Sequence, residues 1–158
     1  MGRRSTQDCE DLRPPGSSLV PAERDHSSLL FVYGTLRRGF SRHKYLRAAH
    51  AALVSCGTVH AQLFDLGDFP GAIPSDPGSG LLVGEVYRLP NPGHALKVID
   101  EVEGFSPASP STTLFRRALA EVALENRNTV QAWIYWLNRW RGPRRRIASG
   151  DFARISEL

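Results

Sequence analysis

The chain has 158 residues, of which 41% are hydrophobic and 23% charged, and its formal net charge is +4. This length suits one domain with its own hydrophobic core, and the composition is that of an ordinary globular protein. No apolar run approaches the roughly 20 residues of a membrane-spanning helix. No apolar segment follows the N-terminal charges as it would in a secretory signal. We therefore expect a cytoplasmic protein with no membrane partner.

The N-terminal segment differs in composition from the rest of the chain. Met1 to Ser28 is rich in serine, proline and charged residues and has no periodic apolar face. Such a segment buries too little apolar surface to offset the entropy lost on ordering. We predict a disordered tail over residues 1–28 and one domain over residues 29–158.

The predicted domain opens with a buried strand, because Leu29–Tyr33 is a short continuous apolar run that stops at a glycine. Further apolar segments predict, in chain order, a helix over 41–52, a strand over 54–64 and a strand over 81–89. Residues 65–80 are rich in glycine, proline and aspartate, and this composition predicts an irregular loop.

The next helix has clear predicted ends. Asn91 is a good N-cap, Pro92 suits the first helical position, and Gly104 is the residue type that commonly follows a helix. After a loop rich in proline and serine, residues 115–124 and 129–137 are predicted to form an antiparallel hairpin. Strands in neighbouring pairs with few helices between them predict an α+β fold around a mostly antiparallel or mixed sheet, curled like a barrel.

One acidic residue of this helix shares a face with apolar residues. At about 100° per residue, Leu96, Ile99 and Glu103 lie on one face, whereas Glu101 points away and Asp100 lies on the border. Burial and the negative end of the helix dipole would both raise the pKa of the Glu103 carboxyl, and a raised pKa suits a general base. The alternative is a carboxylate that reaches solvent or pairs with an arginine.

A glycine turn follows the first strand directly. Gly34 allows a tight turn in which successive backbone N–H groups converge on an anion. The ending of a phosphate-binding P-loop is absent, and the pattern does not match a dinucleotide-binding fingerprint. The histidines and cysteines show no metal-ligand spacing. A glycine turn is by itself more often structural than functional.

Five segments, in order, resemble the γ-glutamylcyclotransferase and AIG2-like family, and in particular its short bacterial-type and γ-glutamylamine-cyclotransferase-like branch. They are Phe31–Gly39, Phe69–Ala72, Val83–Tyr87, Ile99–Gly104 and Ser149–Phe152. One departure is Arg42-His43, where close relatives often carry Asn-His. A second is the loop Ser106–Ser111, which matches no family segment.

The resemblance implies a curled α+β fold and an enzyme that cleaves a γ-glutamyl amide by cyclising it to 5-oxoproline. It implies that Glu103 is the catalytic acid and base. The implied substrate-binding residues are Tyr33, Gly34, Thr35, Leu36, Pro70 and Gly71. It implies a small-molecule γ-glutamyl partner and no metal or other cofactor. The sequence leaves the leaving amine and the oligomeric state open.

Two other functions fit parts of the sequence. The same fold can serve as a non-catalytic small-ligand or interaction module. A nucleic-acid-binding protein is the second alternative, because arginines interleaved with aromatic residues suit phosphates and bases. The residues concerned are Arg139, Arg141, Arg144, Arg145, Arg146, Trp136 and Trp140. Gly142-Pro143 within this patch favours a solvated loop.

Overall fold

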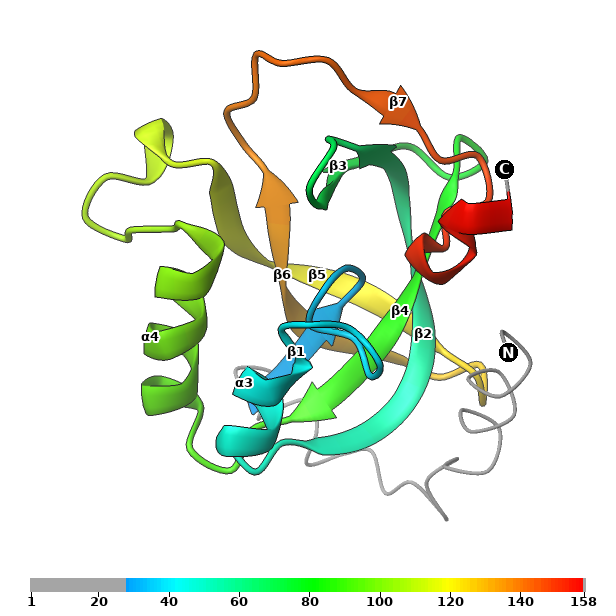
Figure 1. Ribbon diagram of the computed structural model, residues 1–158. Coiled ribbons are helices and arrows are strands. Elements are labelled where there is room, and N and C mark those ends of the chain that lie inside the picture. Colours follow the sequence, from blue (N-terminus) through cyan, green and yellow to red (C-terminus); the bar gives the residue numbers. More distant parts are fainter. Residues whose placement is uncertain (1–27, 158) are drawn as a thin grey trace.

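Seven strands form one strongly curled sheet, and two helices lie along one side of it (Figure 1). The computed structural model describes residues 28–157. The elements are β1 (Leu29–Val32), α3 (His43–Ala48), β2 (Ala52–Asp65), β3 (Pro70–Pro74), β4 (Leu81–Arg88), α4 (Pro92–Glu103), η2 (Pro110–Thr112), β5 (Phe115–Leu124), β6 (Thr129–Leu137), β7 (Arg145–Arg146) and η3 (Phe152–Glu157).

The sheet closes on itself. Its strand order is β3-β2-β4-β1-β6-β5, and β2 also pairs with β5. Neighbours are antiparallel except for β1 and β6, which are parallel. The predicted barrel-like mixed sheet and the predicted β5–β6 hairpin are therefore confirmed.

Alternate side chains of β1 enter two different cores. Leu29 and Phe31 pack with residues of the other barrel strands. Leu30 and Val32 pack in a second core that contains residues of α3 and α4. Because both faces of β1 are covered, its sequence is a continuous apolar run instead of an alternating one.

The helix α4 has the predicted ends. Asn91 accepts a hydrogen bond from the His94 N–H, and Gly104 adopts a left-handed conformation with φ of 70°. The other helix, α3, is shorter than predicted. His50 has a φ of 58° just after it, and β2 begins at Ala52. The chain must leave the helix there to join the sheet.

The prediction of an irregular loop over residues 65–80 is wrong for Pro70–Pro74. This segment is β3, which pairs antiparallel with the end of β2, from Asp65↔Pro70 to Ala61↔Pro74. Proline is tolerated at the ends of an edge strand, where a missing N–H removes no essential ladder bond. The hydrogen bonds to the long strand β2 therefore make this segment a strand, although its composition is typical of a turn.

Apart from Ser28, the predicted tail over residues 1–28 lies outside the described residues and stays a prediction. Within residues 28–157, no helix is both long and apolar enough to cross a membrane.

Candidate active site

A cavity of about 160 Å³ lies between the end of α4, the loop after β1 and the start of β3. Its lining includes Tyr33, Gly34, Thr35, Leu36, Pro70 and Glu103 from the predicted set, together with Arg42, Phe69, Leu114, Phe115 and Tyr135. Gly71 is not in the lining. A side chain at Gly71 would meet Leu66 and Leu137, so this glycine serves the packing of β3.

Glu103 faces the cavity from the last turn of α4. Leu96 and Ile99 on the same face are buried, as the helical spacing predicts. The Glu103 side chain is only 13% exposed, and its Oε2 lies 3.3 Å from Nη1 of Arg42. Burial raises the pKa of the Glu103 carboxyl to about 7, and the nearby Arg42 opposes this rise. The carboxylate is thus both inward-facing and paired with an arginine.

Asp100 is also buried, which corrects its expected position at the border of the helix face. Its carboxylate accepts hydrogen bonds from Arg117 Nε at 2.8 Å and Nη2 at 3.1 Å, and from the Tyr135 hydroxyl at 2.6 Å. The guanidinium of Arg117 also lies over the Trp133 ring, with 4.6 Å to its centroid. Asp100 therefore joins α4 to β5 and β6 and leaves Glu103 as the less fully paired carboxylate.

Three consecutive residues of the cavity lining have backbone N–H groups with no hydrogen-bond partner among residues 28–157. Within residues 28–157, the N–H groups of Gly34, Thr35 and Leu36 donate no hydrogen bond, although these three residues line the cavity. Their loop is held by its carbonyls instead, since Arg37 N donates to Gly34 O and Arg42 N donates to Thr35 O, both at 3.0 Å. A row of free N–H groups is suited to bind an anion.

Gly34 is required by a close approach and not by its backbone conformation. Its φ is not positive, in contrast to that of Gly39. A Cβ at Gly34 would lie 2.8 Å from Cγ of Pro70. The glycine therefore lets the loop after β1 pack directly against the start of β3, and this contact closes one side of the cavity.

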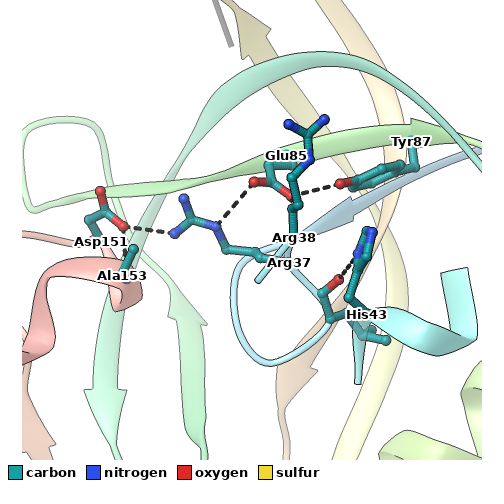
Figure 2. A network of polar contacts seen from close by, with 8 residues as sticks. Arg37, Arg38, His43, Glu85, Tyr87, Asp151 and Ala153 are labelled. Carbon is teal, nitrogen blue, oxygen red and sulfur yellow. Dashed lines mark hydrogen bonds and ion pairs between the residues drawn. The ribbon is translucent and has the colours of Figure 1, made fainter. Parts of the chain in front are cut away.

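A network of charges behind the loop holds it against β4 (Figure 2). Oε1 of Glu85 accepts hydrogen bonds from the Arg38 N–H at 3.0 Å and the Tyr87 hydroxyl at 2.9 Å. Arg37 lies between two carboxylates, with Nε 3.7 Å from Glu85 Oε2 and Nη1 2.7 Å from Asp151 Oδ1. The loop is thus tied to β4 and to the segment before η3.

His43 belongs to this network and not to the cavity lining. Its Nδ1 lies 3.0 Å from the Leu36 carbonyl oxygen, and its ring packs near that of Tyr87 (Figure 2). The histidine therefore supports the loop from behind.

The Tyr33 hydroxyl is fully engaged within the fold. It donates to the Tyr135 carbonyl at 2.6 Å and accepts from the Ala72 N–H at 3.1 Å. Burial, and secondarily the charge of Glu103, raise the pKa of this hydroxyl above its usual range. Tyr33 therefore lines the cavity and, through its oxygen, joins the segment just after β1 to β6 and β3.

Sequence reasoning missed several residues of the cavity. Arg42 stood out only as a departure from the family pattern. Phe69 and Phe115 come from different parts of the chain, and their rings lie 6.0 Å apart. No local signal placed Phe115 or Tyr135 near Glu103, because β5 and β6 reach the site only when the barrel closes.

The basic patch is partly used within the fold. Arg144 lies over the Phe64 ring, Arg145 pairs with Asp65 at 3.3 Å, and Arg146 donates to the Ser79 carbonyl at 2.7 Å. Trp136, expected among its aromatic residues, is buried in the barrel core, where β6 places it. Trp140 packs against Phe69, with 5.8 Å between ring centroids.

Comparisons with known proteins identify the family of this chain. The family model described as Gamma-glutamyl cyclotransferase, AIG2-like, matches residues 30–154. The Gamma-L-glutamyl-butirosin B gamma-glutamyl cyclotransferase of Niallia circulans is 35% identical over 111 residues, which are 70% of this chain and 67% of the relative. A putative gamma-glutamylcyclotransferase of Vibrio cholerae is 39% identical over 77 residues, 48% of this chain and 61% of that protein.

The fold has counterparts among solved structures. The crystal structure of an AIG2-like protein from Mus musculus superposes with a TM-score of 0.57 at 25% identity, over 72% of this chain and 79% of the mouse chain. The family model and the named relatives agree on an enzyme of the cyclotransferase class, and the chain belongs to the gamma-glutamyl cyclotransferase, AIG2-like family.

Proposed function

We propose that the protein cleaves a γ-glutamyl amide by cyclising its γ-glutamyl group to 5-oxoproline, with Glu103 as general base and then general acid. The observation that carries the proposal is a largely buried carboxylate, with its pKa raised to about 7, in the same cavity as three residues whose backbone N–H groups have no partner among residues 28–157. A base that titrates near neutral pH is matched to proton transfer in the cell.

The α-nitrogen of the substrate loses two protons, because its ammonium becomes the N–H of a lactam. The α-ammonium gives the first proton to Glu103, and the resulting amine attacks the γ-carbonyl carbon. The leaving nitrogen takes this proton from Glu103 as its bond to the γ-carbon breaks, and Glu103 then takes the second proton from the ring nitrogen and passes it to the departing amine. The products are 5-oxoproline and an ammonium, and no water is consumed.

The loop after β1 has the complementary role in this proposal. Negative charge develops on the γ-carbonyl oxygen as the amine attacks, and N–H groups that are already oriented stabilise such a charge. We assign Gly34, Thr35 and Leu36 to hold this oxygen or the substrate carboxylate. Tyr33 and Pro70 form walls that favour the bent, ring-like form of the glutamyl chain, and Gly71 supports Pro70 through packing.

A panel of candidate substrates tests the proposal. Purified protein is incubated with γ-glutamyl amino acids, γ-glutamyl-lysine, glutathione and γ-glutamylated small amines, and 5-oxoproline is measured. We expect release from at least one of them, in the absence of added metal or other cofactor. Release from none would instead favour a non-catalytic small-ligand module.

Glu103→Gln keeps the shape of the side chain and removes the base. We expect 5-oxoproline release to fall by roughly 10²-fold or more. Glu101→Gln is the comparison within the same helix. The structure places Glu101 in the cavity lining as well, although the helical spacing predicts that it points away. Its side chain is exposed, in contrast to that of Glu103, and the effect should be far smaller. Normal turnover by Glu103→Gln would refute the assignment. The cytoplasmic location remains an expectation, which fractionation of cells can test.

A further inference from the structure

Arg42 is a cation inside the proposed site that the mechanism above does not use. It lines the cavity, and its Nη1 lies 3.3 Å from Glu103 Oε2 and 3.5 Å from the Val102 carbonyl oxygen. Within residues 28–157, Nε and Nη2 of Arg42 donate no hydrogen bond. The Arg42 side chain is 39% exposed, so its guanidinium is partly in solvent and can change partner.

The γ-glutamyl group carries opposite charges on one carbon atom. Its α-carbon bears an ammonium and a carboxylate, and both must be held while the chain bends into a ring. Glu103 and Arg42 present a carboxylate and a guanidinium side by side in the cavity. An ammonium that approaches Glu103 therefore brings its own carboxylate close to Arg42. Guanidinium groups bind carboxylates well because two N–H groups match two oxygens.

We propose that Arg42 binds the α-carboxylate of the substrate while Glu103 faces the α-amine. This inference rests on the proposed cyclotransferase function. In the free protein the Glu103 carboxylate pairs with Arg42. When the substrate binds, its α-carboxylate replaces Glu103 as the partner of Arg42. The free N–H groups of Gly34, Thr35 and Leu36 are then left for the γ-carbonyl oxygen.

The other charged and titratable groups near Glu103 do not offer the same role. Asp100 is already bound by Arg117 and Tyr135. The Tyr33 hydroxyl is committed to the Tyr135 carbonyl. Among the described residues that line the cavity, Arg42 is the one with a cationic side chain.

Two substrates that differ only in the α-carboxylate test this inference. The leaving amine with the fastest turnover in the panel is attached either to the γ-carboxyl of L-glutamate or to 4-aminobutyrate. The second compound keeps the amine and cyclises to 2-pyrrolidinone. We expect wild-type kcat/KM to favour the γ-glutamyl compound by about 10- to 100-fold, the range of one charge-assisted hydrogen-bonded contact.

Arg42→Met should remove most of this preference. Its kcat/KM should fall about 10- to 100-fold for the γ-glutamyl compound and less than about 3-fold for the 4-aminobutyryl compound. Arg42→Lys should keep part of the preference, since it retains the charge without the planar fork. Arg47→Met is the matched control: this arginine is exposed on α3 outside the cavity lining, and the preference should stay at the wild-type value. Circular dichroism and thermal melting show whether each variant is folded.

Two results would overturn the inference while leaving the proposed function in place. The first is an equal loss by Arg42→Met on both substrates, which would mean that Arg42 acts only through Glu103. The second is a wild-type enzyme that releases 5-oxoproline yet does not distinguish the two compounds. If wild-type protein cyclises nothing in the panel, the proposed function fails, and the inference fails with it.

Discussion

Arginine–carboxylate pairs lie on both sides of the loop after β1, and they have different roles on the two sides. Behind the loop, Arg37 and Glu85 are each 4% exposed, and Arg37 also reaches Asp151. In front of it, Arg42 is 39% exposed and pairs with Glu103. Behind the loop, Arg37 contacts both Glu85 and Asp151, and this rear network holds the loop backbone in place. In front of the loop, the partly exposed Arg42 can separate from Glu103.

The environment decides how much each arginine contributes to stability. Removing one member of a buried pair leaves an uncompensated buried charge, which is strongly destabilising. Removing one member of a solvent-accessible pair has a small effect, because water replaces the lost contact. A comparison of Arg37 with Arg42 therefore separates a structural arginine from a functional one.

The largest expected effect is on the rear network. Arg37→Met should lower the free energy of unfolding by about 3 to 5 kcal/mol, because Glu85 stays buried without its cation. Arg42→Met, the same substitution in front of the loop, should lower it by a smaller amount, because Arg42 is partly exposed and Glu103, with a pKa of about 7, can take up a proton when its cation is lost. Urea denaturation measures both values.

A double variant sharpens this contrast. Arg37→Met combined with Glu85→Gln removes both charges and should recover part of the lost stability. Equal losses for Arg37→Met and Arg42→Met would contradict the distinction between the two sides of the loop.

The second prediction concerns the pH dependence of stability. The fold raises the pKa of Glu103 from its ordinary value of 4.5 to about 7. The folded state therefore favours the protonated carboxyl, and this stabilisation is complete below pH 4.5, declines as the pH rises towards 7 and is absent above it. The rise corresponds to roughly 3 kcal/mol.

Glu103→Gln removes this dependence. The variant should gain up to about 3 kcal/mol in unfolding free energy relative to wild type between pH 4 and pH 8. Urea denaturation at several pH values measures the difference. Glu101→Gln keeps Glu103 and should follow the wild-type curve. A constant difference between Glu103→Gln and wild type would mean that Glu103 is not buried as described.

The smallest expected effect is on the contact between the loop and β3. Gly34→Ala places a methyl group 2.8 Å from Cγ of Pro70, so the cavity wall must shift. We expect a loss of about 1 to 3 kcal/mol in stability, with lower kcat/KM for the best panel substrate.

Gly93→Ala is the matched control for Gly34→Ala. Gly93 lies in α4, and nothing lies within 4 Å of a Cβ added there. Alanine is the better helix former, so this variant should be neutral or more stable by up to about 1 kcal/mol. Equal behaviour of the two variants would show that Pro70 can give way without cost.

The sequence alone determined the local parts of this protein. The apolar run of β1 and the capping residues Asn91 and Gly104 act within a few residues of themselves, so their effects can be predicted from the chain. The spacing of apolar residues in α4 is also local, and it predicts that Glu103 faces inward. The ordered family segments also identified the loop Gly34–Leu36 that lines the cavity.

Only the tertiary structure decided which distant residues meet. Pro70–Pro74 forms a strand because it pairs with β2, and its composition does not predict this pairing. Asp100 became buried because Arg117, on another element, paired with it. Arg42 reached Glu103 across 61 positions of the chain. Contacts between distant strands depend on the register in which the barrel closes, so they cannot be predicted from any one segment. These contacts determine that Asp100 is fully paired and that Glu103 can accept a proton.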